Sequence, residues 1–266
     1  MIKPINSLKE AEEYFETFDD QSIVLFDIDN TLVTYPHAIM RDDNIHLRNK
    51  FFSFLREKYD SDLANKIWEY ADARMILLEP EVLFKILNIA KGQTLAVTAR
   101  RTGKPNKEVK SDVEEIILNI LKDLGITFKN NLTSESEIIL HEIDVDLVTK
   151  IENNLTNFDE PGKPKYKDGI IFTCNLNKGT ILNFFLDKIK YNPSRIYFFD
   201  DKLKNLNEMM EYCKNQNIEF YGFQCLYYTK LGNDIPDNIL NILSKQTHSI
   251  DELSEFNKFK DSLLGL

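Results

Sequence analysis

Acidic, hydroxyl and basic residues follow four short apolar runs in this sequence. In chain order they are Asp27 with Asp29, Thr98, Lys178, and Asp200 with Asp201. Apolar runs of this length are typical of buried strands, which do not tolerate acids unless a positive charge accompanies them. The pattern therefore indicates a site where these acids gather around a cation, and it argues against a solvated charged surface.

The acids predict the kind of cation. Four carboxylates at one site would repel one another unless a metal ion joined them. No histidine or cysteine has ligand spacing near them, and oxygen ligands alone favour Mg²⁺, which keeps waters and pairs with phosphate. We therefore expect Mg²⁺ as the cofactor.

The other residues suit phosphoryl transfer. A strand-end carboxylate beside the metal can attack phosphorus and form an aspartyl-phosphate. Thr98 can donate a hydrogen bond to a phosphoryl oxygen, helped by the backbone N–H of Ala99. Lys178 can offset the negative charge of the transition state. Positioning and charge stabilisation make up most of what such a reaction requires.

Four segments carry a family resemblance. The runs "DIDNTL", "VTAR", "NKG" and "FFDDKLKN" resemble motifs I to IV of the haloacid dehalogenase (HAD) superfamily of aspartate-nucleophile phosphatases. The match covers 22–34, 93–101, 170–180 and 195–207, in the order of the superfamily. The layout of the whole chain also resembles, more weakly, an uncharacterised HAD subgroup of host-associated bacteria, which indicates no substrate.

The resemblance implies a role for each matched residue. Asp27 is the nucleophile, and Asp29 is the acid and base for the leaving group and offers its backbone carbonyl to Mg²⁺. Thr98 binds the phosphoryl group, and Lys178 stabilises both it and the nucleophile. Arg100 is a weaker candidate for substrate binding, and a structural salt bridge or solvent exposure is favoured over that role.

Motif IV leaves one assignment open. The superfamily pattern ends in an acid or amide, and aligning Asn205 with that position makes Asp201 the direct metal ligand and Asp200 the supporting one. Asn205 is also a weak candidate for binding phosphate. Because the motif here has two consecutive acids, which of them contacts the metal stays undecided.

The apolar runs must be arranged so that their ends meet. Runs that are apolar on both faces suit the centre of a parallel sheet, and helical patterns at 108–123, 178–189 and 203–214 lie between them. The sequence thus predicts an α/β, Rossmann-like parallel sheet flanked by helices, with ligands at the carboxyl ends of the strands. Whether 125–128 or 169–174 is the third core strand stays open. The predicted strands are 22–27, 93–98, 169–174, 195–200 and 218–223, with 125–128 as a weaker sixth.

Two segments are longer than the connection between two parallel strands requires. Residues 35–79 hold two amphipathic helical patterns and predict a small helical cap, so that 1–34 and 80–266 form the core. Residues 130–168 are polar with glycine and proline, and they are a possible second insertion. The last 33 residues predict two further helices, the second opened by a capping box of Ser249 and Glu252.

Composition limits the partners. The net charge of −10 and the pI near 5.0 argue against nucleic acid as a partner. No run of 18 or more apolar residues exists, so we expect no membrane span. Three cysteines without metal spacing indicate a reducing compartment. The first 20 residues resemble an amphipathic helix rather than a signal peptide, which favours a cytoplasmic protein. The alternative is an exported bacterial protein whose leader is absent from this sequence.

Several functions fit these residues unequally. The favoured hypothesis is a Mg²⁺-dependent phosphomonoester hydrolase acting on a phosphorylated small molecule or a phosphorylated protein side chain. The alternative is a catalytically silent binding protein with the HAD fold, for example a host-directed bacterial effector. A signalling receiver domain places its acid pair before the phosphorylated aspartate, which is the reverse of the order here. A P-loop kinase is excluded because the sequence has no G-x-x-x-x-G-K-[ST] motif.

Overall fold

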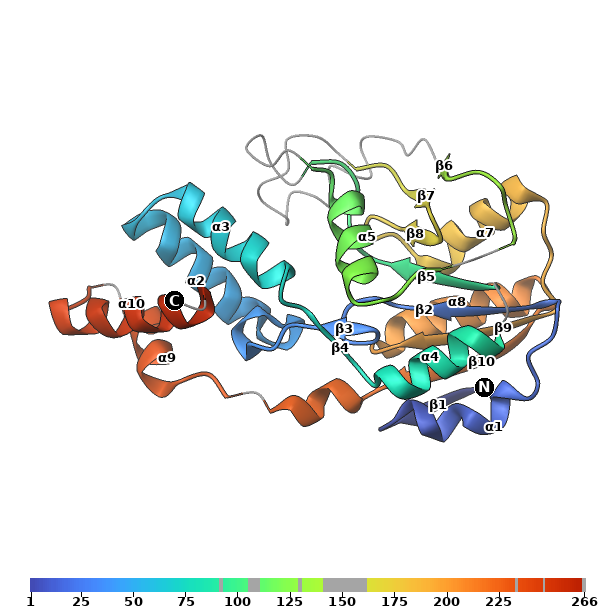
Figure 1. The fold of residues 1–266 in the computed structure, drawn as a ribbon, viewed down its shortest axis with the longest axis horizontal. Coiled ribbons are helices and arrows are strands. Elements are labelled where there is room, and N and C mark those ends of the chain that lie inside the picture. Colours follow the sequence, from blue (N-terminus) through green and yellow to red (C-terminus); the bar gives the residue numbers. More distant parts are fainter. Residues whose placement is uncertain are drawn as a thin grey trace. The chain divides into compact units, whose positions relative to one another are not determined.

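The structure is a computed structural model in which two units can be distinguished. It describes residues 1–90, 93–104, 111–128, 131–140, 162–232, 234–245 and 247–264. Unit 1 consists of Met1–Leu32 and Leu77–Tyr228, and unit 2 consists of Val33–Ile76 and Thr229–Leu266. Figure 1 shows both units, coloured along the chain.

Unit 1 is built on an eight-stranded sheet with the strand order β1-β10-β9-β2-β5-β8-β7-β6. Every pairing from β1 across to β8 is parallel, and the last two pairings are antiparallel. The fold class is therefore α/β and Rossmann-like, as predicted. The strands are β1 (Ile2–Ile5), β2 (Ser22–Phe26), β5 (Thr94–Thr98), β6 (Glu137–Ile139), β7 (Lys165–Lys167), β8 (Ile170–Phe172), β9 (Arg195–Asp200) and β10 (Glu219–Cys225).

The strong apolar runs all form strands of this sheet. The predicted strands at 22–27, 93–98, 169–174, 195–200 and 218–223 correspond to β2, β5, β8, β9 and β10. The weaker run 125–128 forms no strand, because it begins in the turn that ends the helix α5 (Val113–Asp123). Gly125 has a φ of 81°, its N–H donates to the carbonyl of Lys122, and Ile126 N donates to the Leu121 carbonyl, which is a Schellman motif. The third core strand is therefore 169–174.

The structure corrects the prediction for the N-terminal segment. We predicted an amphipathic helix over the first 20 residues, but the chain begins with β1, which pairs in parallel with β10 at the sheet edge. The N-terminal ammonium of Met1 donates to the carbonyl of Phe220, and Ile5 is fully buried. Helical structure follows only as the short turns η1 (Leu8–Ala11) and α1 (Glu12–Phe15). An edge strand of four residues is too short for its period to stand out from a helical one.

The possible insertion at 130–168 lies partly outside the described residues. Of the part that the structure describes, β6 and β7 form an antiparallel pair, and β7 continues the main sheet next to β8. These two strands therefore belong to the core sheet. Residues 141–161 lie outside the described residues.

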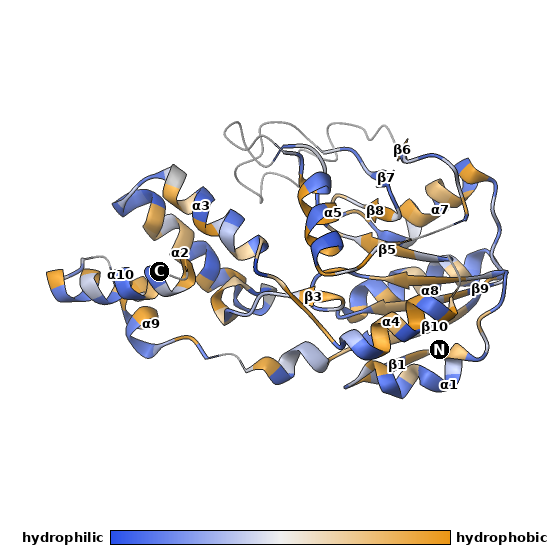
Figure 2. Cartoon of the chain, viewed as in Figure 1, coloured by the Kyte–Doolittle hydropathy of each residue, from blue (hydrophilic) through white to orange (hydrophobic). Residues whose placement is uncertain are grey.

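Helices of unit 1 cover the sheet with their apolar faces. The predicted helices at 178–189 and 203–214 form as α7 and α8, while the one predicted at 108–123 begins at Val113. Figure 2 shows the central strands as predominantly hydrophobic and helices such as α5 and α8 with both hydrophobic and hydrophilic residues. This is the pattern of amphipathic helices on a buried sheet. The helices are α4 (Pro80–Ile89), α5 (Val113–Asp123), α7 (Lys178–Ile189) and α8 (Leu203–Asn215).

Unit 2 is helical apart from β3 (Val33–Thr34) and β4 (Ile76–Leu77), which pair with each other in the connections between the units. The two helices predicted for the cap form as α2 and α3, and the two predicted at the C-terminus form as α9 and α10. The capping box is confirmed: Ser249 N donates to the carboxylate of Glu252, and Glu252 N donates to the hydroxyl of Ser249. The helices are α2 (Ile45–Lys58), α3 (Ser61–Asp72), α9 (Asp237–Ser244) and α10 (Ile250–Leu264). The short 3-10 turns η2 (Ala38–Met40) and η3 (Asp42–Asn44) precede α2, and η4 (Tyr227–Leu231) precedes α9.

The boundary that we predicted for the cap is wrong at the C-terminus. We assigned 229–266 to the core, whereas the structure places this segment in unit 2 with α2 and α3. Two helices alone leave their apolar stripes exposed, and α9 and α10 cover them. Phe256 of α10 is fully buried, with its ring centroid 5.4 Å from Phe51 and 4.4 Å from Phe54 of α2.

Candidate active site

The predicted site residues lie at the carboxyl edge of the parallel strands of unit 1. Strands β9, β2, β5 and β8 are neighbours in the sheet, so their carboxyl ends share one edge. Asp27 directly follows β2, and its N–H donates to the carbonyl of Phe199 in β9 at 2.8 Å. Thr98 is the last residue of β5, and Asp200 is the last residue of β9. The backbone thus holds these groups at fixed strand ends.

Lys178 lies at the centre of the cluster. Its ammonium is 2.6 Å from Oδ1 of Asp27 and 2.7 Å from Oδ2 of Asp200, and its side chain is only 1% exposed. Lys178 is the first residue of α7, whose N-cap is Asn177, with an Oδ1 that accepts from Thr180 N. Two strands and one helix therefore bring three charged groups together inside the protein.

Gly179 explains why Lys178 can come so close. A Cβ at Gly179 would lie 2.7 Å from Cβ of Tyr212 and 3.0 Å from the carbonyl oxygen of Glu208. Both partners belong to α8, so α7 packs too tightly on α8 for any side chain at this position. The "NKG" run thus has a packing reason as well as a chemical one.

Asp200 is held by several donors. Besides Lys178, its Oδ1 accepts from the N–H of Lys202 at 2.8 Å, and the amide of Asn205 donates to both of its oxygens at 3.0 Å. Asn205, which was a weak candidate for binding phosphate, therefore orients Asp200. This fits the supporting role that the resemblance implied for Asp200.

Asp201 has an oxygen that is available for a ligand. Its Oδ2 accepts a long hydrogen bond of 3.4 Å from the amide of Asn30, while its buried Oδ1 has no hydrogen-bond partner among the described residues. Asp27, Asp200 and Asp201 each place one carboxylate oxygen within 4.8 Å of the others. Three carboxylate oxygens at this spacing fit a hard divalent cation.

Asn30 was missed by the sequence reasoning. Its backbone lies in the left-handed region with φ 59°, which asparagine tolerates better than most residues. That turn directs the chain after Asp29 so that the Asn30 amide reaches Asp201. An asparagine directly after the second aspartate of the motif was the only sequence signal for it.

The pKa values of the clustered side chains are shifted from their ordinary values. Burial raises the pKa of Asp27 well above its ordinary value, Lys178 opposes the shift, and Asp200 and Asp201 add to it. Burial and the neighbouring Asp200 raise the pKa of Asp201 to about 7. Burial favours the neutral amine of Lys178, but Asp200 and Asp27 outweigh it and raise the pKa of this lysine. A bound cation would act with Lys178 against the upward shifts of the pKa values of Asp27 and Asp201.

Asp29 points to a different partner from the other acids. Its Oδ2 accepts from Nε of Arg100 at 2.8 Å, and its Oδ1 accepts from Nη2 of Arg100 at 2.6 Å. Its side chain is not one of the three that could share a cation in the described part of the chain. The salt bridge favoured for Arg100 is therefore present, and its partner is the residue that the resemblance makes the acid and base.

The predicted phosphate-binding residues Thr98 and Ala99 lie at the carboxyl end of β5 and are held by the segment that follows β8. The fully buried Thr98 accepts at its carbonyl from Thr173 N, and the Ala99 carbonyl accepts from Asn175 N, each at 2.9 Å. Cys174 and Asn175 both have positive φ, at 52° and 62°. Two consecutive left-handed residues without glycine are costly, and such conformations cluster at functional sites. Sequence reasoning gave no signal for them.

The fold and the site together define a class of protein. It is an α/β protein with a mostly parallel sheet and a buried cluster of three carboxylates and one lysine at the carboxyl ends of its parallel strands. The family model described as "Protein of unknown function (DUF2608)" matches residues 4–259, and the chain belongs to this family.

Two curated relatives resemble the chain at low identity. An uncharacterized protein of Rickettsia prowazekii is 24% identical over 230 residues, covering 86% of this chain and 78% of the relative. A protein of Chlamydia trachomatis serovar D, whose name provisionally describes an outer membrane protein, is 23% identical over 121 residues, covering 44% of this chain and 45% of the relative. No solved structure matches the chain. Within the described residues, no helix combines the length and apolarity needed to cross a membrane.

Proposed function

We propose that this protein is a Mg²⁺-dependent phosphomonoester hydrolase that works through an aspartyl-phosphate on Asp27. The observation that supports this most is the buried ammonium of Lys178 between Asp27 and Asp200, next to the unpartnered Oδ1 of Asp201. Burying such a cluster opposes folding, which favours a role in function over a role in stability. The resemblance of four segments to the motifs of HAD phosphatases adds to this argument.

The proposed roles follow from the geometry. Asp27, Asp201 and, in support, Asp200 would hold the cation, with the backbone carbonyl of Asp29 as a further ligand implied by the resemblance. When bound, the cation supplies positive charge to the phosphoryl oxygens. Lys178 holds one oxygen of Asp27 and leaves the other to face phosphorus.

The reaction would proceed in two steps on these side chains. In the first, an oxygen of Asp27 bonds to phosphorus, the ester P–O bond breaks, and the leaving oxygen takes a proton from Asp29. In the second, a water attacks phosphorus and gives its proton to Asp29, the bond to Asp27 breaks, and phosphate leaves. Thr98 and the N–H of Ala99 would bind the transferred group.

Two measurements test this proposal directly. Purified protein should hydrolyse an activated aryl phosphate with added Mg²⁺ and lose the activity in EDTA. Beryllofluoride, which mimics a phosphoryl group, should bind at Asp27 in the presence of Mg²⁺, as mass mapping or a crystal structure would show. A label on Asp200 or Asp201, or full activity in chelator, would rule the mechanism out.

The alternative is a catalytically silent binding protein on the same fold. Such a protein would bind Mg²⁺ and beryllofluoride without turning over any ester in a panel of sugar phosphates, nucleotides and phosphopeptides. That panel would also separate a phosphorylated small molecule from a phosphorylated protein side chain as the substrate.

We also propose the cytoplasm as the compartment. All three cysteines are free and buried thiols, which fits a reducing environment. Export is the alternative, which the name of the Chlamydia trachomatis relative brings into consideration. Fractionation of the source bacterium with an antibody to the protein would decide between the two.

A further inference from the structure

Arg100 and Asp29 form a bidentate ion pair on the partly exposed side of the site. Two guanidinium nitrogens bond to the two oxygens of Asp29, with side-chain exposures of 18% for Arg100 and 26% for Asp29. The Lys178 cluster beside it is almost fully buried. A ligand that enters from solvent can therefore reach this pair without unfolding anything. While the pair is closed, each oxygen of Asp29 accepts a hydrogen bond from Arg100, which competes with a role as proton donor to a leaving group.

The backbone of Arg100 is fixed while its side chain is long. Its N–H donates to Oγ1 of Thr98 at 3.2 Å, and its carbonyl accepts from Cys174 N at 3.3 Å. A change of partner would therefore move the side chain of Arg100 and leave its backbone in place. Since Arg100 lies two residues after Thr98, whatever it binds must lie close to the phosphoryl group.

We infer that Arg100 determines substrate specificity by exchanging Asp29 for an anionic group of the substrate. This inference rests on the proposed function. The substrate class is then a phosphate monoester that carries a second anion, a carboxylate or a second phosphate, close to the ester being cleaved. Its binding turns the guanidinium away from Asp29 and frees that carboxylate to serve the leaving group.

The exchange favours an anion for a physical reason. A guanidinium matches a carboxylate or phosphate in the same two-pronged geometry that it now makes with Asp29. An anionic substrate replaces one charged pair by another of the same kind. A neutral substrate offers no replacement, so Arg100 either stays on Asp29 or loses its partner at a cost. Only the anionic substrate releases Asp29 without that cost.

Matched substrates and variants test the exchange. We expect the wild type to prefer phosphoglycolate over its neutral amide by roughly 10- to 100-fold in kcat/KM, which is the range for a hydrogen-bonded charged pair. Arg100→Gln should lose most of this preference by raising the KM of the acid while leaving that of the amide unchanged. Arg100→Lys should keep part of this preference, because lysine preserves the positive charge but not the bidentate geometry of the guanidinium.

The control is an arginine of the same sheet outside the site. Arg195 pairs with Glu219 at the opposite end of β9, and Arg195→Gln should keep the full preference for the acid. A structural role for Arg100 would weaken both esters equally. An equal loss on both esters in Arg100→Gln, or equal use of acid and amide by the wild type, would overturn the inference.

Binding separates this inference from the proposed function. Calorimetry on Asp27→Asn with Mg²⁺ measures the preference for phosphoglycolate over its amide without turnover. Preference that disappears in Asp27→Asn/Arg100→Gln supports the exchange even if the wild type hydrolyses nothing. No preference in Asp27→Asn contradicts the exchange even if the wild type is an active phosphatase. Absence of turnover and of a beryllofluoride adduct at Asp27 would reject the proposed function alone.

Discussion

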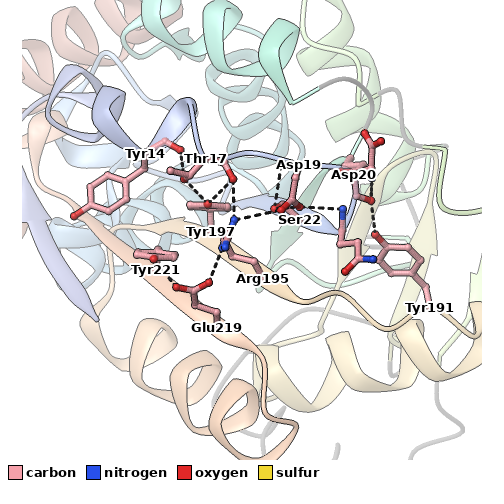
Figure 3. A network of polar contacts seen from close by, with 12 residues as sticks. Tyr14, Thr17, Asp19, Asp20, Ser22, Tyr191, Arg195, Tyr197, Glu219 and Tyr221 are labelled. Carbon is pink, nitrogen blue, oxygen red and sulfur yellow. Dashed lines mark hydrogen bonds and ion pairs between the residues drawn. The ribbon is translucent and has the colours of Figure 1, made fainter.

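The two ends of strand β9 carry charged pairs of similar geometry in opposite surroundings. At its start, Arg195 donates to Glu219 at 2.7 Å and lies 3.4 Å from Asp19, whose side chain is half exposed. Figure 3 shows this network, in which Arg195 lies between these acids and beside Tyr197. At its end, Asp200 pairs with Lys178 at 2.7 Å, and both side chains are essentially inaccessible to water.

The difference shows that pairing distance does not reveal what a charge does. Water still reaches the network around Arg195 in the folded chain, where the side chains of Asp19 and Glu219 are about half exposed, so its pairs contribute little. Lys178 and Asp200 lose their water on folding, and their attraction only partly offsets that loss. The charged pairs at the amino end of β9 are therefore ordinary surface ion pairs. The buried pair at its carboxyl end marks a candidate functional site.

The largest effect expected is on turnover when the proposed nucleophile is replaced. Asp27→Asn should lower hydrolysis of an activated aryl phosphate by at least ~10³-fold, because the attacking carboxylate oxygen is gone. The fold should persist, since the change removes one anion from a crowded set and Lys178 keeps Asp200 as a partner. Steady-state kinetics and circular dichroism measure the two. Residual activity near that of the wild type would show that Asp27 is not the nucleophile.

The next effect is on stability when the central cation is removed. Lys178→Met should lower the free energy of unfolding by ~3–5 kcal/mol, because it leaves buried carboxylates without their positive partner. Denaturant unfolding measures this. A triple variant that also carries Asp27→Asn and Asp200→Asn should recover much of the loss, since it has no buried charge to compensate. If Lys178→Met unfolds at the same denaturant concentration as the wild type, the burial argument fails.

A third effect is the dependence of the metal-free protein on pH. The pKa of Asp201 is about 7 in the folded chain, against 3.8 ordinarily, so the folded state retains a proton that the unfolded chain releases. The stability that this contributes is fully present below pH ~4 and is lost as the pH rises through about 7. Asp27 shifts in the same direction. Stability in EDTA should therefore fall between pH 5 and 8, by an amount on the order of 1–3 kcal/mol.

Metal and a matched variant sharpen this pH test. Mg²⁺ should stabilise the protein more at pH 8 than at pH 5, because it takes the place of the protons. Asp201→Asn should reduce the fall with pH in EDTA and weaken the response to Mg²⁺. His37 opposes the trend, since burial lowers its pKa and favours the folded state as the pH rises. A fall of the same size in Asp201→Asn would assign the pH dependence to other groups.

The central sheet could be predicted from the sequence because its strands are buried on both faces. Runs such as 22–27 and 195–200 are apolar throughout, and their ends carry the acids, so strand and site were found by one signal. The edge strands lack this signal. β1 has four residues of mixed burial, and β6 alternates exposed and buried positions over three.

The parts of the site that escaped prediction depend on contacts between distant segments. Asn30 reaches Asp201 across 171 positions of sequence, and Arg100 reaches Asp29 across 71. The composition around either residue does not encode such distances. The boundary of the cap was missed for a related reason, because the apolar stripe of α10 is complete in itself and does not say which helices it covers.

The smallest effect expected is at the amino end of β9, and it completes the comparison. Arg195→Gln removes the pairs with Glu219 and Asp19, but solvent reaches these side chains and replaces the lost partners. The free energy of unfolding should fall by only ~0–1 kcal/mol, and less at high salt, because exposed pairs are screened. Turnover should equal that of the wild type. Denaturant unfolding of Arg195→Gln and Lys178→Met at low and high salt gives the decisive contrast. Comparable losses in the two variants would mean that burial does not separate the two ends of this strand.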